Sequence, residues 1–201
     1  RAQVGHDWRL ESDEVGEVEY PFPPERMFPP KSGATEGRAN PKGIPCLYTA
    51  TSEKTAVAEV RPWVGALVSI AAFRTTKEMR IVDCTLHGGK IPFFFKVPSG
   101  FYEPEEAERN EAVWAHINNA FSRPLANEAR DADYAPTQIL AEQFRSRRFD
   151  GIGFKSSLGD GYNVALFDVG SARLEGCMLH KIEKVHYEHS QAANSYSVRQ
   201  R

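Results

Sequence analysis

The apolar residues of this chain occur in short runs separated by proline, glycine and charged residues, and this spacing limits the fold more than any other feature. None of the runs approaches the ~20 residues that a membrane-spanning helix needs, so we expect no membrane contact. Short runs bounded by turn-forming residues are typical of buried strands. We therefore predict strands in five such segments, at residues 44–50, 66–75, 79–85, 151–156 and 163–168.

Helix signals lie between these strands. Thr51 and Ser52 can cap the N-terminus of a short helix, and Pro62 ends it. Two longer segments each begin on a proline, which is well tolerated in the first helical turn. We predict helices at residues 53–60, 104–122 and 136–148, with much of the apolar side of the second one formed by Ala107, Val113, Ile117 and Phe121.

The two ends of the chain carry weaker signals. Residues 1–36 mix charge with proline, so we expect one short strand near Trp8 within an irregular lead-in. An alternating segment near 176–188 predicts a last strand, and the polar tail at 190–201 is expected to fray. The sequence shows no internal repeat and no linker, and its length is sufficient for a hydrophobic core. We therefore predict a single α+β domain over residues 1–201.

The charge of the chain is nearly balanced, with 25 Lys and Arg against 27 Asp and Glu. The net charge of −2 lacks the basic excess with which nucleic-acid-binding proteins neutralise phosphates, so we expect no direct nucleic-acid partner. The histidines are scattered, or lie in the charged C-terminal segment without supporting acids. We therefore also expect no metal site.

Three cysteines lie far apart in apolar surroundings: Cys46, Cys84 and Cys177. Their number is odd, and no CxxC or zinc-type spacing is present. This pattern predicts buried, reduced thiols of the kind found in cytosolic proteins, with a single disulfide as the open alternative.

The short helix at 53–60 carries a carboxylate, Glu59, at its C-terminal end, where the helix macrodipole disfavours negative charge. The residue lies at the margin of the apolar stripe of this helix. A facing cation would make the position favourable, and Arg38 and Arg61 are the nearby candidates. A structural salt bridge or a solvated surface carboxylate explains such a residue as well as a functional site does.

Further polar residues lie where strands end and turns begin. Tyr48 ends the predicted strand before the short helix, and Arg38 lies in a Gly- and Pro-rich turn that suits bidentate binding of an anion. Ser156 stands where a strand gives way to a loop, and the Asp-Gly pair at 160–161 predicts a hairpin. Taken singly, a core tyrosine, an exposed loop arginine and a turn serine remain equally good explanations.

Five segments nevertheless stand in a characteristic order: Gly37-Arg38-Ala39-Asn40 with Gly43, Leu47-Tyr48-Thr49-Ala50, Ala56-Val57-Ala58-Glu59-Val60, Asp150-Gly151-Ile152-Gly153-Phe154-Lys155-Ser156 and Asn163-Val164-Ala165-Leu166-Phe167. Their order and spacing resemble the RES-domain family, which is named for an arginine, a glutamate and a serine. Each segment is common by itself, and the resemblance rests on all five in register.

This resemblance implies an ADP-ribosyltransferase-like α+β fold, with a mixed or antiparallel β core and several flanking helices. It implies a toxin enzyme that degrades NAD+ by cleaving the nicotinamide–ribose bond, with ADP-ribose passed to water or inorganic phosphate. NAD+ is then a substrate, inorganic phosphate a further co-substrate, and no cofactor is expected. Two alternatives stay open: a mono-ADP-ribosyltransferase that modifies a protein, and a non-catalytic module that binds NAD+ or ADP-ribose.

The resemblance also assigns two overlapping sets of residues: a catalytic set of Arg38, Tyr48, Glu59 and Ser156, and an NAD+-binding set of Arg38, Asn40, Tyr48, Ser156 and Asn163. A carboxylate beside the ribose stabilises the positive charge that develops as the glycosidic bond breaks, which is the role expected of Glu59. Arg38 is expected to hold the pyrophosphate or orient the ribose. Tyr48 would bound the nicotinamide, and Ser156 would bond its carboxamide or the ribose.

A protein partner is implied in the same way. Toxins of this family are paired with a small antitoxin, often carrying a helix-turn-helix DNA-binding module, that occludes the site. We therefore expect this chain in the bacterial cytoplasm, unless it is part of a delivered effector.

Overall fold

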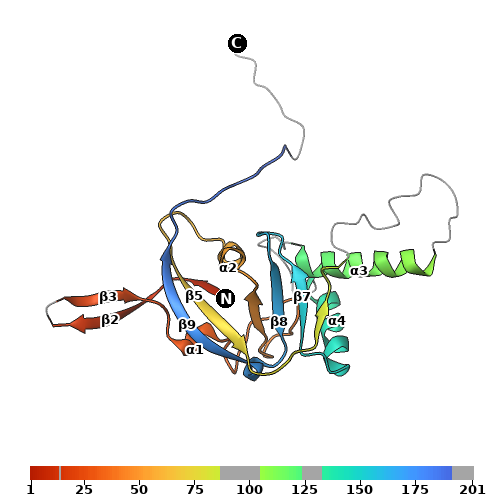
Figure 1. The fold of residues 1–201 in the computed structure, drawn as a ribbon, viewed down its shortest axis with the longest axis horizontal. Helices are drawn as coiled ribbons and strands as arrows, with labels where there is room; N and C mark the ends of the chain where they lie inside the picture. Colours follow the sequence, from red (N-terminus) through yellow and green to blue (C-terminus); the bar gives the residue numbers. More distant parts are fainter. Residues whose placement is uncertain (14, 87–104, 124–132, 192–201) are drawn as a thin grey trace, which may run out of the picture.

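The computed structural model describes residues 1–13, 15–86, 105–123 and 133–191. These residues form an α+β fold with two sheets, a separate hairpin and flanking helices (Figure 1). The first sheet is antiparallel, in the order β1 (Ala2–Val4), β5 (Leu67–Thr75) and β9 (Ala172–Lys181). The second is mixed, in the order β4 (Leu47–Ala50), β8 (Tyr162–Leu166), β7 (Gly151–Lys155) and β6 (Ile81–Asp83).

The predicted α+β class is confirmed, and so are the central elements. β4, β5, β7 and β8 fall within the predicted apolar segments or within one residue of them, and β7 pairs with β8 as the hairpin that the Asp-Gly signal indicated. The strand predicted at 79–85 is shorter, and β6 pairs in parallel with β7 in the second sheet. The chain therefore crosses from one sheet to the other between β5 and β6.

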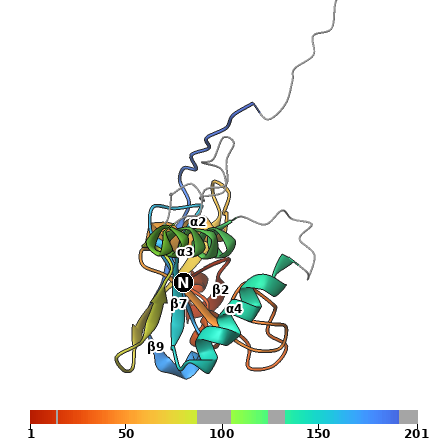
Figure 2. The same ribbon diagram turned by 90° about the vertical axis from the view of Figure 1, so that its right-hand side faces the viewer.

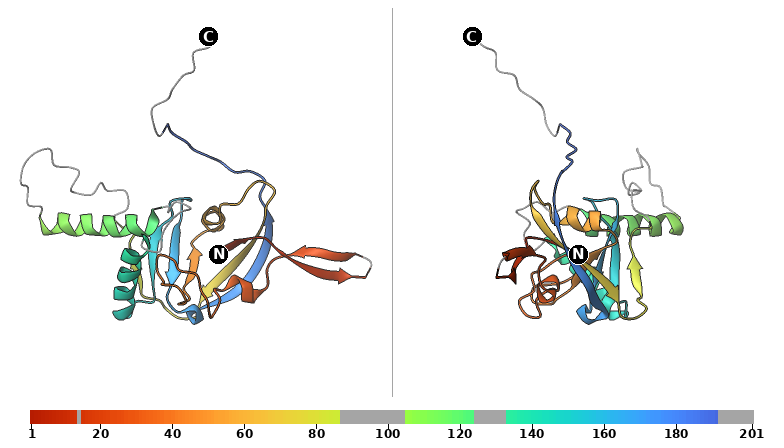
Figure 3. Two further views of the ribbon diagram at one scale, coloured as in Figure 1. Left: turned by 180° about the vertical axis from the view of Figure 1, so that it is seen from behind. Right: turned by 60° about the vertical axis from the view of Figure 1, so that its left-hand side comes forward.

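For residues 1–36 the strand predicted near Trp8 is confirmed as β2, whereas the irregular lead-in predicted around it was wrong. Besides β1, this part contains a hairpin of β2 (Asp7–Ser12) and β3 (Gly16–Tyr20), which projects from the body (Figures 1 and 3), and the short helix α1 (Pro24–Met27). Every β2 side chain is exposed, so this strand lacks the buried alternate positions that mark a strand in a sequence. Gly16, at φ 80°, supplies the left-handed backbone that lets the chain turn back into β3.

The last strand lies a few residues earlier in the chain than predicted. The last strand, β9, ends at Lys181, and residues 182–191 have no regular structure, so the strand predicted at 176–188 begins and ends too late. Most of the polar tail predicted at 190–201 lies outside the described residues. The first residue of the second predicted helix, Pro104, also lies outside them.

Two helices cover one face of the mixed sheet. α3 (Glu106–Ser122) and α4 (Ala135–Ser146) lie against β7 (Figure 2). The buried residues of α3 are Ala115, Asn118 and Phe121, whereas Ala107 and Val113, predicted to lie on its apolar side, are exposed. Phe121 is fully buried, and its ring centroid lies 5.7 Å from that of Phe154 on β7. Among the helices of the described residues, none has the length and apolarity needed to cross a bilayer.

The remaining helix, α2 (Glu53–Glu59), lies in the angle between the two sheets and contacts β1, β4 and β5. Ser52 caps it by accepting a hydrogen bond from the Thr55 N–H at 3.2 Å. Ala56 is buried against Val68 and Ile70 of β5. Burial of this apolar side fixes the rotation of α2 and so directs its last residue, Glu59, away from the core.

All three cysteines are free thiols, and the disulfide alternative is not formed. Cys46 and Cys84 are buried as predicted, whereas Cys177 is half-buried. Burial raises the pKa of the Cys46 and Cys84 thiols to about 12, so both stay protonated at neutral pH.

Alkylation with iodoacetamide at pH 7.5, followed by peptide mass spectrometry, is therefore expected to label Cys177 well before the other two cysteines. In urea, where burial is lost, all three are expected to react at similar rates. Labelling of Cys46 in the native protein as fast as in urea would contradict this expectation.

Candidate active site

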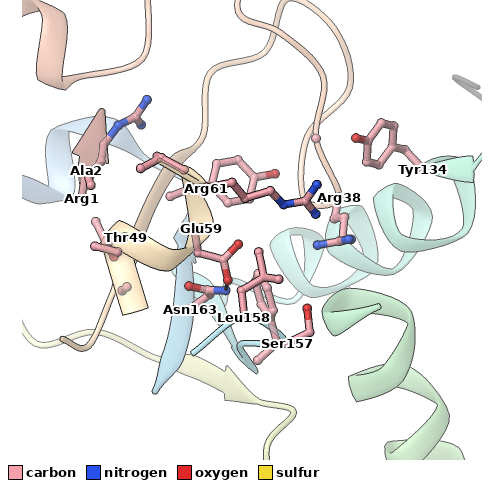
Figure 4. A pocket seen from close by; sticks show the side chains of 16 residues that line it. Arg1, Ala2, Arg38, Thr49, Glu59, Arg61, Tyr134, Ser157, Leu158 and Asn163 are labelled. Atoms are coloured by element: carbon pink, nitrogen blue, oxygen red, sulfur yellow. Dashed lines mark hydrogen bonds between the residues drawn. The ribbon is translucent and has the colours of Figure 1, made fainter. Parts of the chain in front are cut away.

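A cleft of about 420 Å³ opens where the C-terminal end of α2 faces the loop that carries Arg38 and the start of α4. Figure 4 shows Glu59 and Asn163 on one side of this cleft, and Arg38 and Tyr134 on the other. The cleft therefore joins parts of the chain that are distant in sequence, and four of the six predicted site residues line it: Arg38, Tyr48, Glu59 and Asn163.

Glu59 is exposed into the cleft and held by two hydrogen bonds. Its Oε1 atom accepts one from Ser156 Oγ at 2.7 Å and one from Asn163 Nδ2 at 2.6 Å. Within the described residues no hydrogen bond reaches Oε2, so this oxygen is available to a ligand. The salt bridge considered with Arg38 or Arg61 is not among the ion pairs of the described residues. Glu59 is thus oriented by neutral hydrogen-bond donors rather than by an ion pair.

Ser156 lies behind Glu59 rather than in the cleft, since it is only 4% exposed. Its Oγ accepts hydrogen bonds from the backbone N–H groups of Leu158 at 3.2 Å and Gly159 at 3.1 Å. A hydroxyl has one proton to donate, so these two acceptor contacts leave that proton directed at Glu59. The geometry gives Ser156 a positioning role, which differs from the direct contact with NAD+ expected from the sequence.

The loop that carries Ser156 packs closely on α2 through its glycines. The Gly161 N–H donates to the buried Thr55 Oγ1 at 3.1 Å, and the Tyr162 N–H donates to Thr51 Oγ1 at 3.1 Å. A Cβ atom at Gly161 would lie 2.4 Å from Thr55 Oγ1, a distance that no side chain tolerates. Glycine is therefore required here for the close approach of the loop to the helix, and through it for the contact between Ser156 and Glu59.

The Arg38 loop is held by Tyr48 and Asn40. The Tyr48 hydroxyl accepts a hydrogen bond from the Ala39 N–H and donates to Asn40 Oδ1, both at 2.8 Å. The Asn40 amide donates to backbone carbonyls at Thr35, Pro41 and Ile44. Asn40 is only 1% exposed and, like Ser156, does not line the cleft, so these two predicted NAD+-binding residues support the site from behind instead of facing a ligand.

Charge in the cleft is predominantly positive. Arg1, Arg38 and Arg61 all line it, against the single carboxylate of Glu59. Partial burial lowers the pKa of Arg38 and the charge of Arg61 lowers it further, while Tyr134 and Glu59 act in the opposite direction. Burial also raises the pKa of Tyr48, which keeps its phenol neutral and able to donate to Asn40. Such a cleft suits a ligand with more than one negative charge.

Sequence reasoning missed Arg1 and Tyr134 as cleft residues, because neither belongs to a motif or to a periodic pattern. Tyr134 immediately precedes α4, whose Gln138 donates to the Gly37 and Asn40 carbonyls at 3.1 Å. That contact places the start of α4 beside the Arg38 loop. Among the described residues, no three His, Cys, Asp or Glu side chains converge as metal ligands would.

The sequence was also compared with known proteins. The model of the RES domain family matches residues 7–188, which include both halves of the cleft from Arg38 to Asn163. The chain belongs to the RES domain family. No curated protein matches the sequence. The fold of this RES domain is similar to a chain in the crystal structure of the M.tuberculosis MbcT-MbcA toxin-antitoxin complex, at 14% identity and a TM-score of 0.41, covering 90% of this chain and 85% of that chain.

Proposed function

We propose that this RES domain is a toxin enzyme that degrades NAD+ by cleaving the bond between nicotinamide and ribose. One observation carries the proposal: the Glu59 carboxylate is held by Ser156 and Asn163 in a cleft that arginines otherwise line. The arginines suit the pyrophosphate of a dinucleotide, and the carboxylate suits a cation that forms nearby. Membership of the RES domain family supports this combination.

The chemistry follows from the charges. As the bond from ribose C1′ to the nicotinamide nitrogen breaks, its electron pair leaves with nicotinamide and positive charge develops on the ribose ring. The free Oε2 of Glu59 stabilises that charge or holds a ribose hydroxyl in place. An oxygen of water or of inorganic phosphate then bonds to C1′, giving ADP-ribose with release of a proton from water, or a phosphorylated ADP-ribose from phosphate.

The proposal includes a biological setting. NAD+ is consumed as a substrate rather than retained as a cofactor. Uncontrolled activity would therefore deplete the NAD+ of the cell that makes the protein. A cognate antitoxin that covers the cleft would prevent this, as the family resemblance implies. The setting that fits is the bacterial cytoplasm, where NAD+ is available.

Incubation of the purified chain with NAD+, with and without inorganic phosphate, tests the proposal. If water is the acceptor, proton and phosphorus NMR is expected to show free nicotinamide and ADP-ribose in both samples. Nicotinamide and a phosphorylated ADP-ribose that appear only with phosphate would identify phosphorolysis. The Glu59→Gln variant, purified in parallel, controls for contaminating NAD+-degrading enzymes.

Two other outcomes of this experiment would replace the proposed reaction. Label from adenylate-labelled NAD+ that becomes attached to protein would identify a mono-ADP-ribosyltransferase. NAD+ that binds by titration calorimetry and remains intact for hours would indicate a binding module without catalysis.

A further inference from the structure

Two helices of this chain end on an arginine whose backbone is in the left-handed region. Arg61 follows α2 with φ 47°, and Arg148 follows α4 with φ 60°; they are the residues other than glycine with positive φ in the described chain. Each N–H closes the helix end, from Arg61 to the Ala58 carbonyl at 3.1 Å and from Arg148 to the Arg145 carbonyl at 2.9 Å. Glycine is preferred at such positions because a Cβ atom is strained there.

The two arginines differ in what their side chains reach. Arg61 lines the cleft, and Figure 4 shows its side chain directed toward Arg38. Arg148 lies at the other end of α4, between that helix and β7, and is not a lining residue. Only at Arg61 does the strained backbone therefore deliver a charged group to the candidate active site.

Arg38 and Arg61 share the cleft with one carboxylate, Glu59, which forms no ion pair with either of them within the described residues. The charge of Arg61 lowers the pKa of Arg38, so the two guanidinium groups repel each other. Arg38 Nη2 donates to the carbonyl of Arg123, and neither arginine is in an ion pair within the described residues. Two like charges that converge in a cleft become favourable when an anion with several oxygen atoms lies between them.

We propose that Arg61 and Arg38 together bind the pyrophosphate of the dinucleotide, and that the left-handed conformation of Arg61 is retained because it brings this guanidinium to the cleft. The inference rests on the proposed function for the identity of the ligand as a dinucleotide. It adds Arg61 to the binding residues, at a position where stability alone favours glycine.

Matched substitutions at the two helix ends separate binding from stability. Arg61→Gly and Arg148→Gly both relieve the left-handed strain, so each is expected to raise Tm by about 2 °C. Both substitutions also remove a cation from a helix C-terminus, so the small loss of stability from this charge is the same in the two variants.

ADP serves as the probe in titration calorimetry, because it carries the pyrophosphate and lacks the nicotinamide–ribose bond that the enzyme would cleave. Its Kd is expected to increase about 10- to 100-fold in Arg61→Gly, as for the loss of a charged hydrogen-bonding group, and to stay unchanged in Arg148→Gly.

An Arg61→Gly variant that binds ADP as tightly as the wild type would overturn the inference, and so would a wild-type chain that does not bind ADP. These outcomes are separable from a failure of the proposed reaction. If ADP binding weakens only in Arg61→Gly while NAD+ stays intact in every sample, the pyrophosphate site is supported and the cleavage reaction is contradicted. If Arg61→Gly cleaves NAD+ with unchanged KM, the reaction is supported and the pyrophosphate site at Arg61 is contradicted.

Discussion

Replacing Glu59 by glutamine is expected to slow the cleavage of NAD+ by at least ~100-fold, the lower range for loss of one electrostatic stabiliser of a transition state. The two side chains have the same shape. The glutamine carbonyl can accept the hydrogen bonds that Ser156 Oγ and Asn163 Nδ2 now donate to Oε1. The amide nitrogen then takes the place of Oε2, and the negative charge beside the ribose is lost while the geometry of the site is kept.

The rate of nicotinamide release at saturating NAD+ measures this effect, with Tm as the check on folding. Glu53→Gln is a suitable control, because it makes the same change at an exposed residue in the first turn of the same helix. That variant is expected to keep the wild-type rate. A Glu59→Gln enzyme that is as fast as the wild type would remove Glu59 from the mechanism.

Gly161→Ala is expected to lower stability by about 1 to 3 kcal/mol, the usual cost of forcing extra volume into a packed contact. The added methyl group would lie 2.4 Å from Thr55 Oγ1 and 3.0 Å from Thr51 Oγ1. Thr55 is buried and its hydroxyl is bonded to Ser52, so the loop has to move away instead. Because the same loop carries Ser156, the displacement is also expected to reduce the rate of NAD+ cleavage.

Gly176→Ala is a control for which the expected change in stability has the opposite sign. A Cβ atom at Gly176, in β9, meets no other atom within 4 Å, so the same substitution there is expected to stabilise the protein slightly. Urea unfolding of both variants measures the two effects. In the double variant Gly161→Ala with Thr55→Ala, the lost hydroxyl makes room for the new methyl group and part of the stability is expected to return. A Gly161→Ala protein with wild-type stability and rate would show that this contact does not hold the site.

Much of the local structure was predictable from the sequence because its causes are local. The cap at Ser52 and the stop before Pro62 delimit α2 within one residue of its predicted end. The apolar runs of β5, β7 and β8 are bounded by turn residues, and their burial matches their composition. The β2–β3 hairpin escaped prediction because its stability does not come from a buried face, so no apolar period marks it.

The order of the five motifs was enough to assign the RES domain family, and it pointed to Arg38, Glu59 and Ser156 as residues of one site. It did not distinguish which of the motif residues face the cleft. Asn40 and Ser156 belong to motifs as clearly as Glu59 does, yet both are buried and act on neighbouring residues. Facing or supporting the cleft depends on loop geometry, which a pattern of residue types does not encode.

The sequence by itself determined the secondary structure of the core, the α+β class and the family, since each of these depends on residues close together or on their order. Only the tertiary structure decided how the site is assembled. Ser156 and Asn163 reach Glu59 across 97 and 104 positions of the chain, and the Gln138 contacts place Tyr134 beside Arg38. The contacts of Glu59 depend on the packing of α2 between two sheets, and those of Gln138 on the position of α4 beside the Arg38 loop. Packing of this kind is a property of the whole fold rather than of any one segment.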